Sequence, residues 1–113
     1  RIDQAVEFDA EIEELRKRSP DAIANYASVG AYDGMYVIHK MIEATGGQKD
    51  GLKAIAAARA LKWESPRGPV SIDPKTRHIT QNVYLRKVEK AGSTLVNKEV
   101  SNFGPQGDHG IDK

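Results

Sequence analysis

The sequence has 113 residues, the usual size of one domain, and it contains no cysteine. Its 17 basic and 16 acidic residues leave a net charge of +1, so no field of one sign favours nucleic acid or an anionic membrane as a partner. Without cysteine, disulfides, thiolate metal sites and a cysteine nucleophile are excluded.

The first predicted element is a helix over residues 4–18. Its apolar residues Ala5, Phe8, Ile12 and Leu15 recur at spacings of three and four, which places them on one face. The sequence opens inside this pattern, without an initiator Met and without a signal peptide, so we expect it to be part of a longer chain. No apolar run approaches the roughly 20 residues that a membrane-spanning helix needs.

A longer helix is predicted over residues 22–44, after the helix-starting pair Ser19-Pro20 and before Gly46-Gly47. Its apolar residues cover more than half of the circumference, which indicates burial by more than one neighbour. Its first half is rich in small residues, including two glycines that cost about 1 kcal/mol each relative to alanine. Close approach of another backbone or of a ligand to this end would compensate, and packing without a ligand is the alternative.

A shorter helix is predicted over residues 50–61, followed by Trp63 as a core residue with its N–H at the edge. A short strand over residues 70–72 lies between a Gly-Pro corner and an Asp-Pro turn, and Pro69 limits it to a sheet edge or to the start of a strand. Two β-patterned runs at 80–90 and 93–103, joined by a Gly-containing connection, predict a hairpin. Residues 104–113 are expected to form a flexible tail.

Catalytic and cofactor motifs are missing from the sequence. It contains neither a Gly-rich dinucleotide fingerprint nor a phosphate-binding loop, and no serine stands in a nucleophile-elbow motif. His39, His78 and His109 lie far apart in sequence, so a zinc site is not favoured. We therefore expect a protein that is not an enzyme and that holds no metal or cofactor.

Three stretches occur in an order that is informative together: "AYDG" at 31–34, "SPRGPVSIDP" at 65–74 and "QNVYLRKV" at 81–88. This order resembles the C-terminal portion of the type I periplasmic binding proteins, the substrate-binding components of ABC transporters for branched-chain and other hydrophobic amino acids and related small carboxylates. The resemblance spans about residues 5–103. Gly34, where the family usually has alanine, and Ser65, where it usually has glycine, are mild departures.

The resemblance implies an α/β chain with a partial type I fold. Residues 1–64 would be the helical part of a first lobe and residues 65–80 a crossover between lobes. Residues 81–103 would be a β-hairpin of the second lobe, and 104–113 its flexible tail. Strands meant for larger sheets would keep open edges, so we expect the chain alone to form a homo-oligomer, with exchange of the hairpin as one route.

The same resemblance implies a periplasmic protein that binds an amino acid, or an aromatic or aliphatic carboxylate, and delivers it to the membrane subunits of an ABC importer. Tyr26, Ala27 and Ser28 are the candidate ligand contacts, because this end of the long helix faces the cleft in the family. A helix N-terminus also favours anions. In the alternative, the three residues only pack against the protein.

A second hypothesis is a self-contained α+β interaction module, or the sensor part of a receptor built on the same fold. The basic residues Arg16, Lys17 and Arg18 would then form a protein-contact site rather than a solvated helix end.

Overall fold

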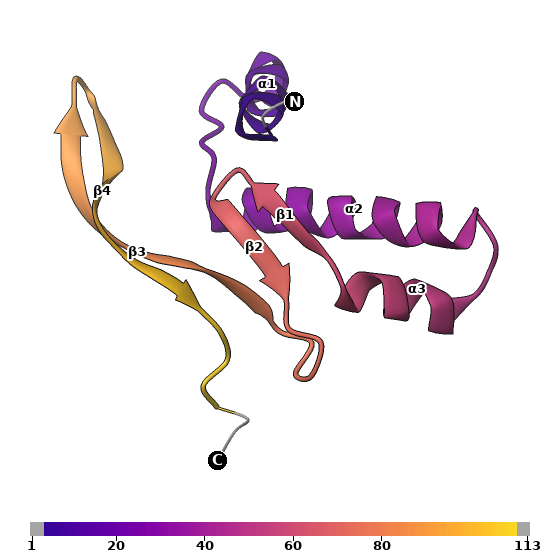
Figure 1. Cartoon of the computed structure of the whole chain (residues 1–113). Helices are drawn as coiled ribbons and strands as arrows, with labels where there is room; N and C mark the ends of the chain where they lie inside the picture. The colour runs from indigo at the N-terminus through magenta and orange to yellow at the C-terminus, as the bar shows by residue number, and fades with distance from the viewer. Residues whose placement is uncertain (1–3, 111–113) are drawn as a thin grey trace.

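The computed structural model describes residues 4–110, which form three helices and one four-stranded sheet (Figure 1). The expected combination of helices and strands in one α/β chain is confirmed. The elements in chain order are α1 (Gln4–Arg18), α2 (Tyr26–Thr45), α3 (Gly51–Arg59), β1 (Lys62–Ser65), β2 (Gly68–Ile72), β3 (Ile79–Ala91) and β4 (Thr94–Gln106).

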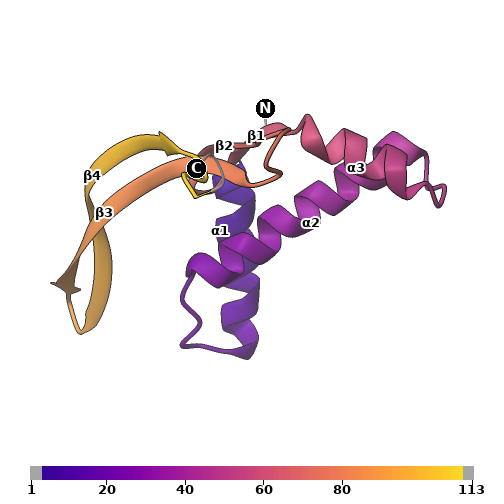
Figure 2. The same ribbon diagram turned by 90° about the horizontal axis from the view of Figure 1, so that it is seen from below.

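Helix α1 has the bounds that its apolar spacing predicts, and it crosses α2 (Figure 2). Phe8 and Ile12 are buried, whereas Leu15 near the end of the helix is half exposed. The Phe8 ring meets the Tyr32 ring of α2 edge-on, with 5.4 Å between their centroids. The side chain of Ala5, the first residue of the predicted face, lies outside the described residues.

Helix α2 begins at Tyr26, four residues later than predicted, because Asn25 and not Ser19 is its N-cap. The Asn25 side-chain oxygen accepts hydrogen bonds from the backbone N–H groups of Ala27 and Ser28, at 2.9 and 3.1 Å. Ser19 instead accepts a backbone hydrogen bond from Ala22 in a turn. The helix ends as predicted at glycine: Gly46 has a φ of 61°, the left-handed conformation that favours this residue.

Strand β1 was not predicted. It spans only four residues, of which Trp63 is the only apolar one, so it carries no periodic signal. It follows α3 closely and pairs antiparallel with β2, with Trp63 opposite Val70. Both side chains are buried and, with Phe8 and Ile12, they are the buried apolar side chains among the described residues. The core is therefore a small cluster between α1, α2 and the β1–β2 hairpin.

The sheet is an antiparallel meander in the order β1-β2-β3-β4. Strand β2 pairs with β3 over three residue pairs only, from Val70 with Gln81 to Ile72 with Ile79. Beyond this point β3 continues with β4 as a two-stranded ribbon that leaves the rest of the molecule (Figures 1 and 2). Residues 104–106, expected at the start of a flexible tail, are in fact the end of β4.

The β3–β4 ribbon is curved rather than straight (Figure 2). Its register shifts twice, between Asn82 and Tyr84 and between Leu85 and Arg86. At both places β4 contributes one residue more than β3, as in β-bulges, which bend a strand and increase its twist. The bend therefore lies just beyond the point where β3 leaves β2.

Candidate functional site

The three predicted ligand contacts, Tyr26, Ala27 and Ser28, are the first three residues of α2. They stand next to a reciprocal cap in which the Ser28 hydroxyl accepts from the Asn25 N–H and also lies 2.9 Å from the Asn25 carbonyl oxygen, to which it can donate. Tyr26 is 91% exposed and presents its ring to solvent. The structure thus places the three residues together at one helix end, with the Ser28 hydroxyl and the first N–H groups already used by the cap.

Two buried polar side chains, those of Asp33 and Ser65, meet elsewhere, at Asp33 in the first half of α2. Asp33 is only 3% exposed, and its two carboxylate oxygens accept from three residues of the β1–β2 hairpin. The indole N–H of Trp63 donates to Oδ1 at 3.0 Å, and the Ser65 hydroxyl donates to Oδ2 at 2.9 Å. The Arg67 guanidinium lies 2.8 Å from Oδ2. Because these partners satisfy and neutralise the carboxylate, it can remain buried.

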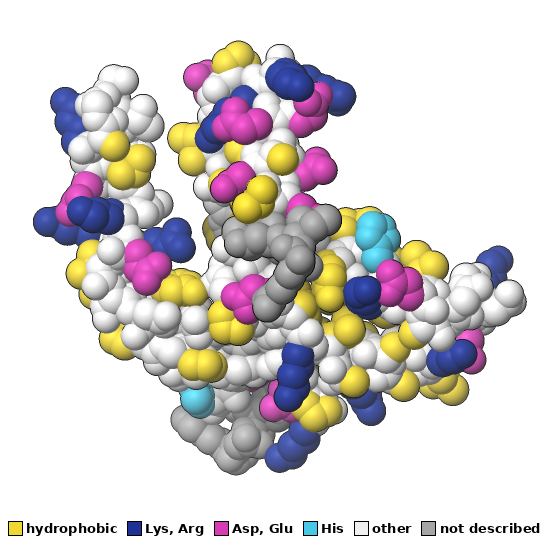
Figure 3. Space-filling model, turned by 45° about the horizontal axis from the view of Figure 1, so that its top comes forward, with side chains coloured by type: hydrophobic (Ala, Val, Ile, Leu, Met, Phe, Trp, Pro, Cys, Tyr) yellow, Lys and Arg dark blue, Asp and Glu magenta, His cyan; other side chains and the backbone are white. Residues whose placement is uncertain are grey.

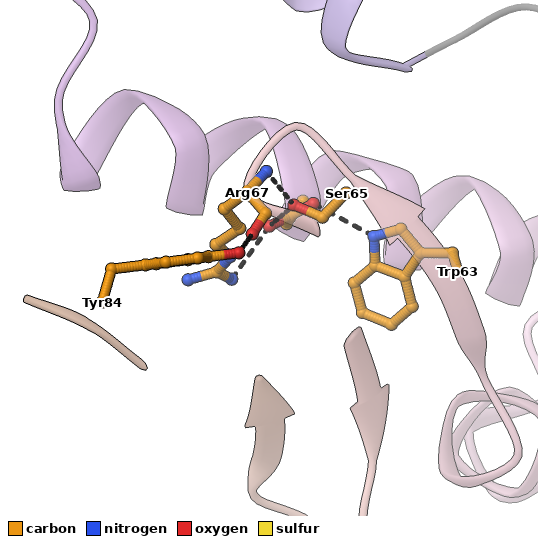
Figure 4. A network of polar contacts seen from close by, with 5 residues as sticks. Trp63, Ser65, Arg67 and Tyr84 are labelled. Atoms are coloured by element: carbon orange, nitrogen blue, oxygen red, sulfur yellow. Dashed lines mark hydrogen bonds and ion pairs between the residues drawn. The ribbon is translucent and has the colours of Figure 1, made fainter. Parts of the chain in front are cut away.

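The network extends from Arg67 to the ribbon (Figure 4). The Tyr84 hydroxyl of β3 donates to the Arg67 carbonyl oxygen at 2.5 Å and accepts from the Asn82 side-chain amide at 3.3 Å. The Ser65 hydroxyl also accepts from the Arg67 N–H. We call Asp33, Trp63, Ser65, Arg67 and Tyr84 the junction network, since it joins α2, the β1–β2 hairpin and the ribbon.

Sequence reasoning missed the junction network, although two signals pointed to it. Asp33 stands among the apolar and small residues of α2, and a carboxylate in such surroundings needs a buried partner. Trp63 was correctly predicted to be a core residue, but its N–H is not at the edge as expected: it is buried and donates to Asp33. What the sequence lacks is any local sign that these two residues, 30 positions apart, meet.

The remaining candidates form no site in the described residues. Arg16 and Lys17 of the basic patch pair with Glu13 and Glu14 on their own helix, so the patch is partly neutralised. Within residues 4–110 no group of three or more histidine, aspartate or glutamate side chains is arranged to hold a metal ion. The described helices include none that is long and apolar enough to cross a membrane.

Two open grooves lie away from the start of α2. One, of about 420 Å³, follows the sheet between Trp63, Thr80 and Pro105. The other, of about 360 Å³, runs between α2 and α3 beside Ile38, Ile42 and Ala54. Neither groove includes Tyr26, Ala27 or Ser28.

Comparison with known proteins gives a consistent result. Residues 8–93 match the model of a family described as periplasmic binding protein. The chain is 59% identical over 102 residues to the Leu/Ile/Val-binding protein homolog 6 of Brucella abortus, covering 88% of this chain and 26% of that protein. The chain thus spans about a quarter of the length of the curated relatives it matches.

Solved structures of similar proteins agree with this family. A solute-binding protein of an ABC transporter from Rhodopseudomonas palustris, in complex with 4-hydroxybenzoate, is 56% identical, with a TM-score of 0.76 over 84% of this chain and 27% of that one. A second, from Rhodopseudomonas palustris HaA2 and in complex with p-hydroxybenzoic acid, is 61% identical, with a TM-score of 0.72 over 75% of this chain and 23% of that one. The expectation of a partial fold is confirmed by these coverages.

Proposed function

Because the chain belongs to the periplasmic binding protein family, we propose that it is the C-terminal part of a solute-binding protein of an ABC importer for small carboxylates. The observation that carries this proposal is the high identity, over most of the chain, to solute-binding proteins of ABC transporters. The complete protein would bind its ligand non-covalently in the periplasm and deliver it to the membrane subunits of the importer. Closure of two lobes about a hinge would enclose the ligand.

For the ligand we favour an aromatic carboxylate of the hydroxybenzoate class over a branched-chain amino acid. The curated relatives have a name that refers to leucine, isoleucine and valine. The solved relatives of similar identity, by contrast, hold 4-hydroxybenzoate, p-hydroxybenzoic acid or 3,4-dihydroxybenzoic acid. A bound molecule in a structure is the more direct indication of ligand chemistry, and it supports this choice.

Tyr26, Ala27 and Ser28 remain our proposed ligand contacts within this part of the protein. The exposed Tyr26 ring offers an aromatic face against which a benzoate ring can stack. Ala27 leaves room beside it, and Ser28 holds the helix end in shape through the cap with Asn25. The groups that grip the carboxylate would come from the rest of the protein.

The test is calorimetric titration of a full-length protein that carries this sequence at its C-terminal end. We expect 4-hydroxybenzoate to bind at least about tenfold more tightly than leucine, which corresponds to about 1.4 kcal/mol. Replacing Tyr26→Ala should weaken hydroxybenzoate binding about 3- to 10-fold, the range expected for one aromatic contact, whereas Tyr26→Phe should preserve it. Tighter binding of leucine would refute the choice of ligand, and equal binding by the Tyr26→Ala variant would refute the site.

A further inference from the structure

The molecule consists of two mechanically different parts. In the first, Asp33 ties α2 to the β1–β2 hairpin through three polar contacts, and the Tyr36 ring stacks on Trp63 with 5.2 Å between centroids. We call α2 with β1 and β2 the body. The second part is the β3–β4 ribbon, which pairs with β2 over three residue pairs before it leaves the body.

Tyr84 connects the ribbon to the body through a hydrogen bond. It lies three residues beyond Gln81, the last residue of β3 that pairs with β2, and its hydroxyl reaches the Arg67 carbonyl oxygen in the β1–β2 turn. Since the side chain of Arg67 is held by Asp33, the contact connects the ribbon to the centre of the body. The guanidinium of Arg86, on the same strand, lies over the Tyr84 ring, 5.6 Å from its centroid.

The β1–β2 turn accommodates this hydroxyl only because residue 68 is glycine. Gly68 has a φ of 103°, and a Cβ atom at this position would lie 2.8 Å from the Tyr84 hydroxyl oxygen. A Cβ atom this close would force the hydroxyl or the turn to shift, and the positive φ adds strain for any residue other than glycine. The turn is thus shaped to receive Tyr84.

The ribbon also bends close to Tyr84. Both register shifts of β3 against β4 fall between Asn82 and Arg86, on either side of Tyr84. Bulges leave a two-stranded ribbon locally with fewer regular ladder bonds, so this is where its angle to the body can change most easily. The Tyr84 hydroxyl is therefore attached to the ribbon between its two bulges.

We propose that the Tyr84 hydroxyl is a brace that sets the angle between ribbon and body, and that it is a positioning residue for ligand binding in the complete protein. The second half of this inference rests on the proposed function, because a narrow range of angles matters only if the two parts belong to lobes that close on a ligand. With the brace, a larger fraction of the ligand-free protein has the arrangement that binds ligand. The apparent affinity is proportional to this fraction, so it rises as the fraction rises.

The experiment compares Tyr84→Phe with the unchanged full-length protein in the absence of ligand. Spin labels at the exposed positions His39, on α2, and Ser93, at the ribbon tip, report the distribution of distances between the two parts. We expect a broader distribution for Tyr84→Phe and an unchanged one for Tyr36→Phe, which removes a hydroxyl within the body while keeping the ring against Trp63. The dissociation constant for 4-hydroxybenzoate should rise about 3- to 10-fold in Tyr84→Phe only.

Gly68→Ala serves as a second variant, since it crowds the hydroxyl while Tyr84 itself is kept. It also strains the turn because of the positive φ of residue 68, and it should broaden the distribution as well. An unchanged distance distribution in Tyr84→Phe overturns the brace. A broader distribution with unchanged affinity supports the brace but overturns its positioning role. If the unchanged protein does not bind hydroxybenzoate, the proposed ligand fails, and the distance distributions still decide whether the brace exists.

Discussion

At the scale of single residues, Asp33 is the buried carboxylate to which three side chains of the junction network bind. A carboxylate this deeply buried is tolerated only while its partners compensate for lost hydration. Three donors from one hairpin do so here, and one of them carries a full positive charge. Removing the charge of Asp33 would leave the Arg67 guanidinium, whose side chain is 26% exposed, without its counter-ion.

We therefore predict that Asp33→Asn lowers the free energy of unfolding by about 2–3 kcal/mol, somewhat less than the loss for a fully buried ion pair because Arg67 retains some solvent. Denaturant titration followed by circular dichroism measures the change. Asp50→Asn is the matched control: Asp50 caps α3 through the Lys53 N–H, and asparagine caps equally well, so its effect should stay within about 0.5 kcal/mol. Equal losses of unfolding free energy in the two variants would show that the buried contacts of Asp33 do not stabilise the fold more than a helix cap does.

At the scale of elements, the sequence predicts the helices and strands that have a clear pattern in their own residues. The apolar spacing of α1 gives its bounds, Asp50 marks the start of α3, and the two β-patterned runs give the ribbon. The start of α2 is mispredicted because Ser19-Pro20 and Asn25 both offer starting signals, and Asn25 forms the better cap. Strand β1 is missed because four residues with one apolar side chain have no period to detect.

The candidate site is predicted less well than the fold. Tyr26, Ala27 and Ser28 follow from the family resemblance, and their role stays a prediction. The junction network could not be located, because Asp33 and its donors are brought together by the packing of α2 on the β1–β2 hairpin, over separations of 30 and 32 residues. The residue types indicate that Asp33 and Trp63 each need a hydrogen-bond partner, but they do not indicate that the two residues bind each other.

The contact between α1 and α2 leads to a prediction about the stability of the fold at alkaline pH. Burial, together with the hydrogen bond to Glu7 and the charge of this carboxylate, raises the pKa of Tyr32 to about 12. The protonated phenol is thus favoured in the folded state. Its contribution is complete below the ordinary tyrosine pKa of about 10 and is lost as the pH rises through the folded pKa of about 12.

We expect the free energy of unfolding to fall between pH 10 and pH 12 more steeply in the unchanged protein than in Tyr32→Phe, by no more than about 1 kcal/mol over this range because solvent screens the partly exposed phenol. Other tyrosines and lysines titrate in both proteins, so the difference between the two curves isolates Tyr32. Tyr36→Phe is the control and should follow the unchanged protein. Parallel curves for Tyr32→Phe and the unchanged protein would mean that the hydrogen bond to Glu7 does not stabilise the fold.

At the scale of the whole molecule, much apolar surface lies outside the small core. Met35, Ile38 and Ile42 on α2 and Leu52 and Ile55 on α3 are all at least 44% exposed. The space-filling view shows α1 and the ribbon tip as two projecting arms, each carrying charges of both signs, with apolar side chains gathered over the helices (Figure 3). Exposed apolar faces of this kind mark surfaces that normally pack against other protein.

The chain spans about a quarter of its curated relatives, so the longer proteins have enough additional chain to cover these faces. A chain of 113 residues on its own has two ways to bury them, namely local rearrangement or association with further copies. Rearrangement is limited, because the junction network and the caps of α2 and α3 fix the elements that carry the apolar residues. Association leaves those elements intact, and the open edges of β1 and β4 give it a ready template.

We therefore predict that the isolated chain forms a homo-oligomer at micromolar concentrations, and that light scattering after gel filtration gives an integer multiple of the chain mass. The double variant Ile38→Glu with Ile42→Glu should shift the distribution towards the monomer if the α2–α3 face is buried in the oligomer, whereas Lys53→Glu, on an exposed position of α3, should leave it unchanged. An oligomer formed by exchange of the ribbon would not respond to the α2 variants. It would also dissociate slowly on dilution, because the β3–β4 segment must leave β2 before it can be exchanged. A monomer at all accessible concentrations would mean that the exposed apolar faces alone do not drive assembly.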